Sequence, residues 1–164
     1  AALAGADVQT INLDGSTAQT VVLTMAGTNM LETVTVNSNS LANSLALLNV
    51  SGVAPTTLNV AGTQDLTITN ITATSALTTV NASGSSGANV FTLGQAFVGT
   101  VTGGSGTDSL TLSTGTNTLS VSGVNAIVGV GGNDTITVTD TAATTITAGS
   151  GTDILGGGNT SRGG

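Results

Sequence analysis

Short alternating segments recur along this chain, and their regular spacing restricts the possible folds more than any other feature. Apolar residues stand two apart, with a hydroxyl or amide residue between them, at Leu48–Val50, Leu58–Val60, Val90–Leu93, Leu110–Leu112 and Ile136–Val138. This is the two-residue period of a β-strand that buries one face. Each segment alone buries too little apolar surface to be stable, so the repeat favours strands that stack on one another.

Glycine-rich turns separate the strands at a similar interval. An acid or amide closes the richer turns at Asp65, Asn89, Asp108, Asp134 and Asp153, at intervals of 24, 19, 26 and 19 residues. Two strands per interval of about 20 residues make one circuit of a parallel β-solenoid. We therefore predict an all-β fold, a right-handed parallel β-solenoid (β-roll or β-helix) with Gly/Asp-rich turns. About eight circuits at the ~4.8 Å strand spacing give a rod of roughly 40 Å.

The repeat is less regular in the first third of the chain. We predict one continuous domain in which residues 1–50 form a less regular solenoid segment and residues 51–164 the regular one. Leu41–Leu48, which reads LANSLALL, is also compatible with one or two helical turns. The end, GGGNTSRGG, resembles another glycine-rich turn cut short, so we expect a fragment of a longer chain.

Composition excludes several classes of function. The 164 residues carry eight acids and a single base, Arg162, for a net charge of −7. Nucleic acids and anionic membrane surfaces require basic patches, and no apolar run reaches the ~20 residues of a membrane span. Without His, Cys, Lys or Tyr the usual bases and nucleophiles are missing, so we expect no enzyme activity. A mean hydropathy of +0.39 argues against disorder.

The acidic turns suggest a cation as the partner. Ca²⁺ takes six to eight oxygen ligands from carboxylates and backbone carbonyls, and two stacked turns could supply them together. Gly103–Thr111 reads GGSGTDSLT and resembles the nonapeptide G-G-x-G-x-D-x-U-x of the repeats-in-toxin (RTX) family at every position. Gly129–Thr137 lacks the second glycine of the motif and Ala148–Gly156 the first, while Gly84–Thr92 carries Asn89 in place of the aspartate.

The resemblance implies calcium as the cofactor and a set of ligands in three turns. These are the carboxylates of Asp108, Asp134 and Asp153 and the glycine segments that contain Gly104, Gly106, Gly129, Gly131, Gly149 and Gly151. Two arrangements remain open. If Ser122–Gly129 is a bulge, all three aspartates share one edge of the solenoid; if it is a half-circuit, only Asp134 and Asp153 stack. The alternative role for each turn aspartate is a hydrogen bond to backbone N–H groups. Four acids outside the motif are expected to be solvated surface charges: Asp7, Asp14, Glu32 and Asp140.

The resemblance also implies a function. Chains rich in Thr, Ser, Asn and Gly with scattered RTX motifs resemble bacterial surface-layer proteins exported by type I secretion. We therefore expect a calcium-stabilised structural subunit of a surface layer or filament on the bacterial cell surface. Its partners would be copies of itself, with cell-surface polysaccharide as a second candidate and neither nucleic acid nor membrane insertion. Two alternatives are an RTX adhesin stalk and an ice-binding face built from the rows Thr67/Thr69, Thr135/Thr137/Thr139 and Thr145/Thr147.

Overall fold

The described residues of the chain form fourteen β-strands. The computed structural model describes residues 7–15, 17, 19–24, 31–51, 55–73 and 76–163. The strands are β1 (Asp7–Asp14), β2 (Gln19–Thr24), β3 (Leu31–Asn39), β4 (Asn43–Ser51), β5 (Thr57–Gly62), β6 (Leu66–Ala73), β7 (Thr79–Ser85), β8 (Asn89–Leu93), β9 (Val98–Thr102), β10 (Ser109–Thr111), β11 (Thr118–Ser122), β12 (Ala126–Val128), β13 (Thr135–Thr147) and β14 (Ile154–Gly163).

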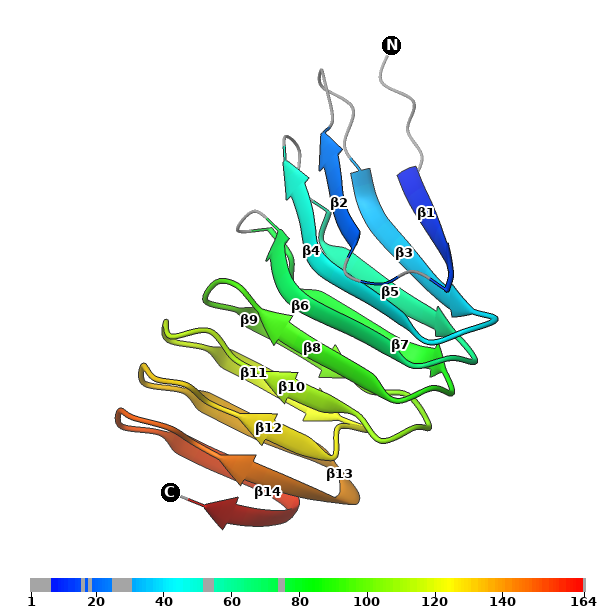
Figure 1. The fold of residues 1–164 in the computed structure, drawn as a ribbon. Coiled ribbons are helices and arrows are strands. Elements are labelled where there is room, and N and C mark those ends of the chain that lie inside the picture. The colour runs from blue at the N-terminus through cyan, green and yellow to red at the C-terminus, as the bar shows by residue number, and fades with distance from the viewer. Residues whose placement is uncertain are drawn as a thin grey trace.

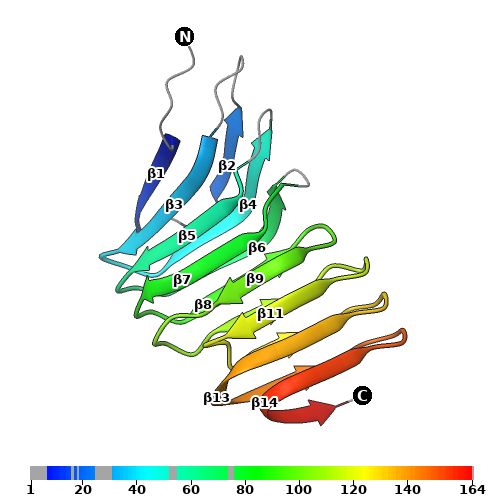
Figure 2. The same ribbon diagram turned by 180° about the vertical axis from the view of Figure 1, so that it is seen from behind.

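The strands are stacked as a parallel β-solenoid. Odd-numbered strands up to β11 pair in parallel with odd-numbered strands, and even-numbered strands up to β12 with even-numbered ones. The first half of β13 continues the odd sheet beside β11, its second half continues the even sheet beside β12, and β14 follows both halves. Even strands run from right to left across the front of Figure 1, and odd strands run from right to left across the front of Figure 2. Because the chain descends as it circles in this direction, the coils are right-handed. The predicted fold class is confirmed.

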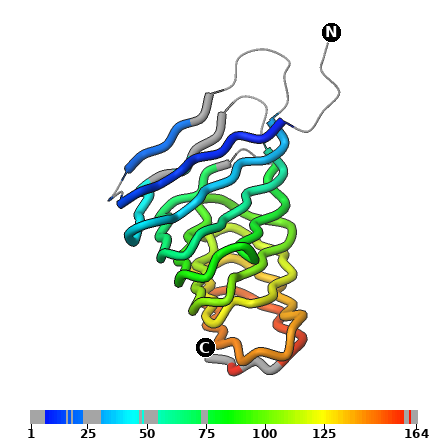
Figure 3. The backbone as a smooth tube through the Cα atoms, turned by 90° about the vertical axis from the view of Figure 1, so that its right-hand side faces the viewer, coloured from blue at the N-terminus to red at the C-terminus, as the bar shows by residue number. Residues whose placement is uncertain are grey.

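The coils become shorter toward the C-terminus. Paired residues lie 25 apart between β1 and β3 (Val8 with Thr33) and 17 apart between β11 and β13 (Leu119 with Ile136). Figure 3 shows the resulting taper of the coils from the N-terminal to the C-terminal end. The solenoid has about six turns at a spacing near 22 residues, rather than the eight turns of about 20 residues expected. The larger mean spacing reflects the longer N-terminal coils.

Two edges connect the two sheets. We name edge A the turns that lead from the odd sheet to the even sheet and edge B the turns that lead from the even sheet to the odd sheet. β13 itself crosses edge A at residues 140–142, so the turn that follows it belongs to edge B. Edge A lies on the right of Figure 1 and edge B on the left. Because every circuit visits both edges, side chains from consecutive circuits are stacked at each of them.

The core is a pair of apolar ladders between the sheets. On the even sheet six buried side chains follow one another in register: Leu45, Ile68, Phe91, Leu110, Ile127 and Ile146. On the odd sheet the matching column is Val34, Leu58, Val80, Val101, Val121 and Val138. Aliphatic side chains therefore fill the interior with almost no aromatic residues.

The alternative reading of residues 41–48 as helical is wrong. From Asn43 onward this segment is β4, which pairs with β2 and β6, and Leu45 and Leu48 point into the core. Pairing on both sides outweighs the weak local preference for a helix. The described part of the chain contains no helix that is long and apolar enough to cross a membrane.

Candidate metal centre at the solenoid turns

The three motif aspartates are divided between the two edges. β11 ends at Ser122, a short turn follows, and β12 begins at Ala126, so residues 122–129 form a half-circuit. This places Asp108 with Gly104 and Gly106 at edge A. Asp134 and Asp153, with the glycines of their own turns, lie at edge B. Of the two arrangements left open by the sequence, the structure has the one in which only Asp134 and Asp153 stack.

At edge B, acid and amide side chains form a ladder of hydrogen bonds between coils. The backbone N–H of Phe97 donates to Asn117 Oδ1 at 3.0 Å, and that of Asn117 donates to Asp134 Oδ1 at 2.9 Å. The N–H of Asp134 then donates to Asp153 Oδ1, also at 2.9 Å. Each side chain thus accepts a backbone N–H from the preceding coil, and the ladder fixes the stacking of the turns.

Asp134 has one carboxylate oxygen that this ladder does not use. Its side chain is 1% exposed, and Oδ1 accepts both the N–H and the Nδ2 of Asn117. Oδ2 is shielded from solvent and has no hydrogen-bond partner among the described residues. A Cβ at Gly129 would lie 3.1 Å from Oδ2, so the glycine keeps the space beside this oxygen open. A buried, unpartnered carboxylate oxygen is costly unless a cation or a donor reaches it.

At edge A the surroundings of Asp108 are different. Its side chain is also 1% exposed, but Oδ1 accepts the N–H and the Nδ2 of Asn89 at 2.8 and 2.7 Å. Oδ2 accepts the N–H of Gly104 at 2.7 Å. The N–H of Asp108 donates to Asn125 Oδ1 on the next coil. Both carboxylate oxygens are therefore satisfied by N–H groups, in agreement with the alternative role proposed for turn aspartates.

Two turns of the same kind carry no charge, and only the first of them was among the turns predicted from the sequence. They read S-x-G-x-N, at Ser85–Asn89 on edge A and Ser113–Asn117 on edge B. In each, the serine hydroxyl donates to the asparagine Oδ1 at 3.3 Å, and the asparagine Nδ2 donates to the carbonyl of the central glycine. The signal that could have found them is the spacing of glycine and asparagine, which equals that of G-x-G-x-D.

Close approach of the coils explains the central glycine of these turns. A Cβ at Gly106 would lie 2.4 Å from the carbonyl oxygen of Gly87, and one at Gly132 would lie 2.6 Å from that of Gly115. At edge B the central glycine of the second motif is thus Gly132, which was not among the glycines predicted from the sequence. The predicted glycine, Gly131, instead forms an isolated bridge with Ser150. The glycines are needed for stacking whether or not a cation is bound.

The acids outside the motif also accept backbone hydrogen bonds. Asp65 Oδ1 accepts the N–H of Ala88, and Glu32 Oε2 accepts that of Asp7. Asp140 Oδ2 accepts the N–H of Gly123, while its Oδ1 is shielded from solvent and unpartnered in the described structure. Asp140 is therefore not the freely solvated charge that was expected. In the described residues, no group of three or more His, Cys, Asp or Glu side chains gathers in one place, so a cation would also need backbone oxygens.

The threonine rows do not form one surface. Thr135, Thr137 and Thr139 lie in the half of β13 that belongs to the odd sheet, whereas the other two rows lie on the even sheet. On the even sheet the positions between Thr67 and Thr145 are occupied in register by Val90, Ser109 and Ala126. The three rows therefore do not stack as a single array.

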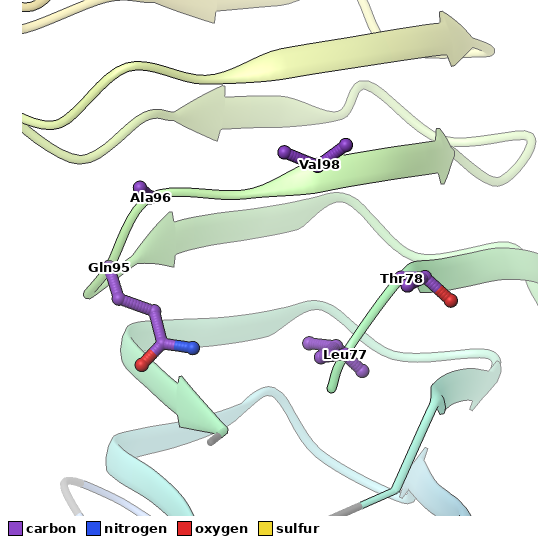
Figure 4. Close-up of a pocket in the computed structure, with 5 residues that line it drawn as sticks. All are labelled: Leu77, Thr78, Gln95, Ala96 and Val98. Carbon is purple, nitrogen blue, oxygen red and sulfur yellow. The ribbon is translucent and has the colours of Figure 1, made fainter. Parts of the chain in front are cut away.

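A shallow pocket opens on edge B, away from the aspartates. Its volume is about 400 Å³, and it lies between segment 77–78 and the turn 95–98 (Figure 4). The lining residues are Leu77, Thr78, Gln95, Ala96 and Val98. None of them can act as an acid, base or nucleophile of ordinary strength, so the pocket has no evident chemistry of its own.

Comparisons with known proteins add no relative. No protein-family model, no curated protein and no solved structure matches the chain. The resemblance to RTX repeats therefore rests on the nonapeptide motif alone, and the geometry of the turns is what supports a metal centre.

Proposed function

We propose that this chain is a structural rod of an extracellular assembly, a surface layer or a filament, in which calcium braces edge B. The observation that carries the proposal is the buried, unpartnered Oδ2 of Asp134 one coil away from a second carboxylate, that of Asp153. Asp134 and Asp153 would hold the ion together with carbonyl oxygens of segments 129–132 and 148–151. These oxygen donors are the kind that Ca²⁺ prefers.

The distribution of charge supports a structural role over a catalytic one. Between residues 55 and 158 every carboxylate lies at one of the two edges, where at least one of its oxygens accepts a backbone N–H. From β7 to the first half of β13, outward positions of the odd sheet are occupied by neutral, mostly hydroxyl-bearing residues, as in the registered column Thr79, Thr100, Ser120 and Thr137. Such faces are suited to broad contacts with other surfaces and provide no acid–base pair.

Calcium bracing links this role to the cell exterior. Extracellular calcium modules commonly bind at 10⁻⁴–10⁻³ M, so a site of this kind is largely filled outside the cell and empty in the cytoplasm. Because binding free energy adds to folding free energy, the ion would stabilise the rod after export, as through type I secretion. The proposed partners are further copies of the chain, with cell-surface polysaccharide as a second candidate.

Electron microscopy of the purified protein tests the proposal. We expect ordered sheets or filaments in millimolar CaCl₂ and their loss in EGTA, with MgCl₂ as the control because Mg²⁺ dehydrates reluctantly and prefers a smaller octahedral site. Separate rods under all of these conditions would contradict the assembly role and favour a stalk.

A further inference from the structure

In the neutral S-x-G-x-N turns, the asparagine side chain makes the contacts that a cation would make in the acidic turns. In the turn that ends at Asn117, Nδ2 donates to the carbonyl oxygens of Gly115 at 2.7 Å and Ser113 at 3.2 Å. The same nitrogen donates to Asp134 Oδ1 at 3.0 Å. One positively polarised group thus joins two turn carbonyls to the carboxylate of the next coil. A divalent cation between two acidic turns would make the same connection.

Asn89 makes the corresponding contacts at edge A. Its Nδ2 donates to the carbonyl of Gly87 at 3.1 Å and to Asp108 Oδ1 at 2.7 Å. The coil on the other side of Asp108 also carries a neutral residue, Asn125, whose Oδ1 accepts the N–H of Asp108. Asp108 therefore has no carboxylate on either neighbouring coil at its own position, and N–H groups already occupy both of its oxygens.

We propose that Asn89 and Asn117 are built-in replacements for a cation, so that the best match to the nonapeptide, the turn ending at Asp108, binds no calcium. The calcium site is then confined to edge B, between the turns ending at Asp134 and Asp153. This inference rests on the proposed calcium brace and specifies where it acts. It departs from the family pattern, in which each motif turn is expected to contribute to a site.

The contrast depends on the residue that precedes each aspartate on its edge and the one that follows it. Edge A has the order Asn89, Asp108, Asn125, while edge B has Asn117, Asp134, Asp153. Only at edge B do two carboxylates follow each other. There the Oδ2 of Asp134 lacks the N–H partner that Gly104 gives to the Oδ2 of Asp108. Of the two equally buried motif aspartates, only Asp134 therefore lacks a donor that a cation could replace.

Calcium titration of two matched variants tests the inference. Asp108 and Asp134 are equally buried, and each accepts two N–H groups from one asparagine. By isothermal titration calorimetry we expect one calcium per wild-type chain, an affinity within about threefold of this for Asp108→Asn, and at least a tenfold weaker affinity for Asp134→Asn. The reverse pattern, or two wild-type equivalents of which each variant loses one, would overturn the inference and leave the brace intact.

Two further arms complete the test, and the first of them uses the wild-type protein and so does not depend on how well the variants fold. On the wild-type protein, calcium should shift the amide NMR signals of residues 129–134 and 148–153 and leave those of 103–108 unchanged; a shift confined to 103–108 rejects the inference.

The second arm is the variant Asn89→Asp, which places a second carboxylate beside Asp108. It should add one calcium equivalent, and no added equivalent contradicts the replacement role of Asn89. A wild-type chain that binds no calcium rejects the proposed brace itself.

Discussion

Asn117 is the residue on which edge B depends most. It is fully buried, and its Oδ1 accepts from Phe97 and Ser113 while its Nδ2 donates to Gly115 and Asp134. A buried side-chain amide whose oxygen and nitrogen both make hydrogen bonds contributes strongly to the free energy of unfolding, because its removal leaves several buried groups without partners.

Replacing this amide should destabilise the rod strongly. We expect Asn117→Ala to lower the free energy of unfolding by at least about 3 kcal/mol, because each buried group left unpaired costs about 1–3 kcal/mol. Asn125→Ala is the control, since Asn125 is exposed and its side chain accepts the N–H of Asp108 alone; its cost should be near 1 kcal/mol. Urea denaturation measures both, and equal losses would contradict the ladder.

The two buried aspartates should respond differently to amidation in the absence of calcium. Asp108→Asn places an NH₂ group against a donor, because N–H groups face both carboxylate oxygens, and should cost about 1–3 kcal/mol. Asp134→Asn keeps its oxygen toward Asn117 and places NH₂ where no donor points, so it should be neutral or stabilising. Urea denaturation in EGTA separates these outcomes. A larger loss for Asp134→Asn would argue against the assigned partners.

At the scale of elements, the coil-over-coil contact at the turns allows no side chain at the central glycine. Gly106→Ala should cost about 1–3 kcal/mol, because its Cβ would lie 2.4 Å from a backbone oxygen and the two coils must separate. Gly156→Ala in β14 is the matched control, since nothing lies within 4 Å of its Cβ, and it should be tolerated. Thermal melts of the two variants provide the comparison, and a harmless Gly106→Ala would contradict the stacking of the turns.

The core ladder predicts a second element-scale effect. Phe91 is the largest fully buried side chain and lies between Ile68 and Leu110 on neighbouring coils. Its replacement by alanine should cost about 3–5 kcal/mol through lost burial and the cavity left behind. Ile127→Val, one ladder step beyond Leu110, should cost only about 0.5–1.5 kcal/mol. Denaturant midpoints test the ranking, and a cost for Phe91→Ala no larger than that for Ile127→Val would contradict the ladder.

The sequence predicted the strands and the solenoid because a two-residue alternation and a 20-residue period are local properties of the chain. It could not decide on which edge Asp108 lies, since that depends on whether Ser122–Gly129 pairs as a strand or bulges, and pairing is a tertiary property. It also missed the turn at Ser113–Asn117. Serine and asparagine there replace the glycine and aspartate of the motif, and only the hydrogen bonds reveal that the two kinds of turn are equivalent.

At the scale of the whole molecule, the two edges differ in which groups face the carboxylate oxygens of their motif aspartates. Solenoid stability is nearly a sum of coil and neighbour-interface terms, so one weak interface loosens the structure locally. With no cation, the coils that carry Asp134 and Asp153 place a buried, unpartnered oxygen and two successive carboxylates at edge B.

Calcium should therefore protect one end of the rod more than its middle. In EGTA we expect faster amide hydrogen exchange in residues 129–163 than in residues 79–122, and calcium should slow exchange in the first region with little effect on the second. Hydrogen-exchange mass spectrometry gives the comparison, with MgCl₂ as the control. Equal protection of both regions by calcium would mean that edge A also takes part.

The central claim is that a calcium ion braces successive coils at edge B, and a crystal structure grown in calcium tests it most directly. The anomalous difference map should contain a peak beside Asp134 Oδ2 and the Asp153 carboxylate, and no peak beside Asp108. A peak at Asp108, or an Asp134 side chain turned into solvent with no ion near it, would contradict the claim.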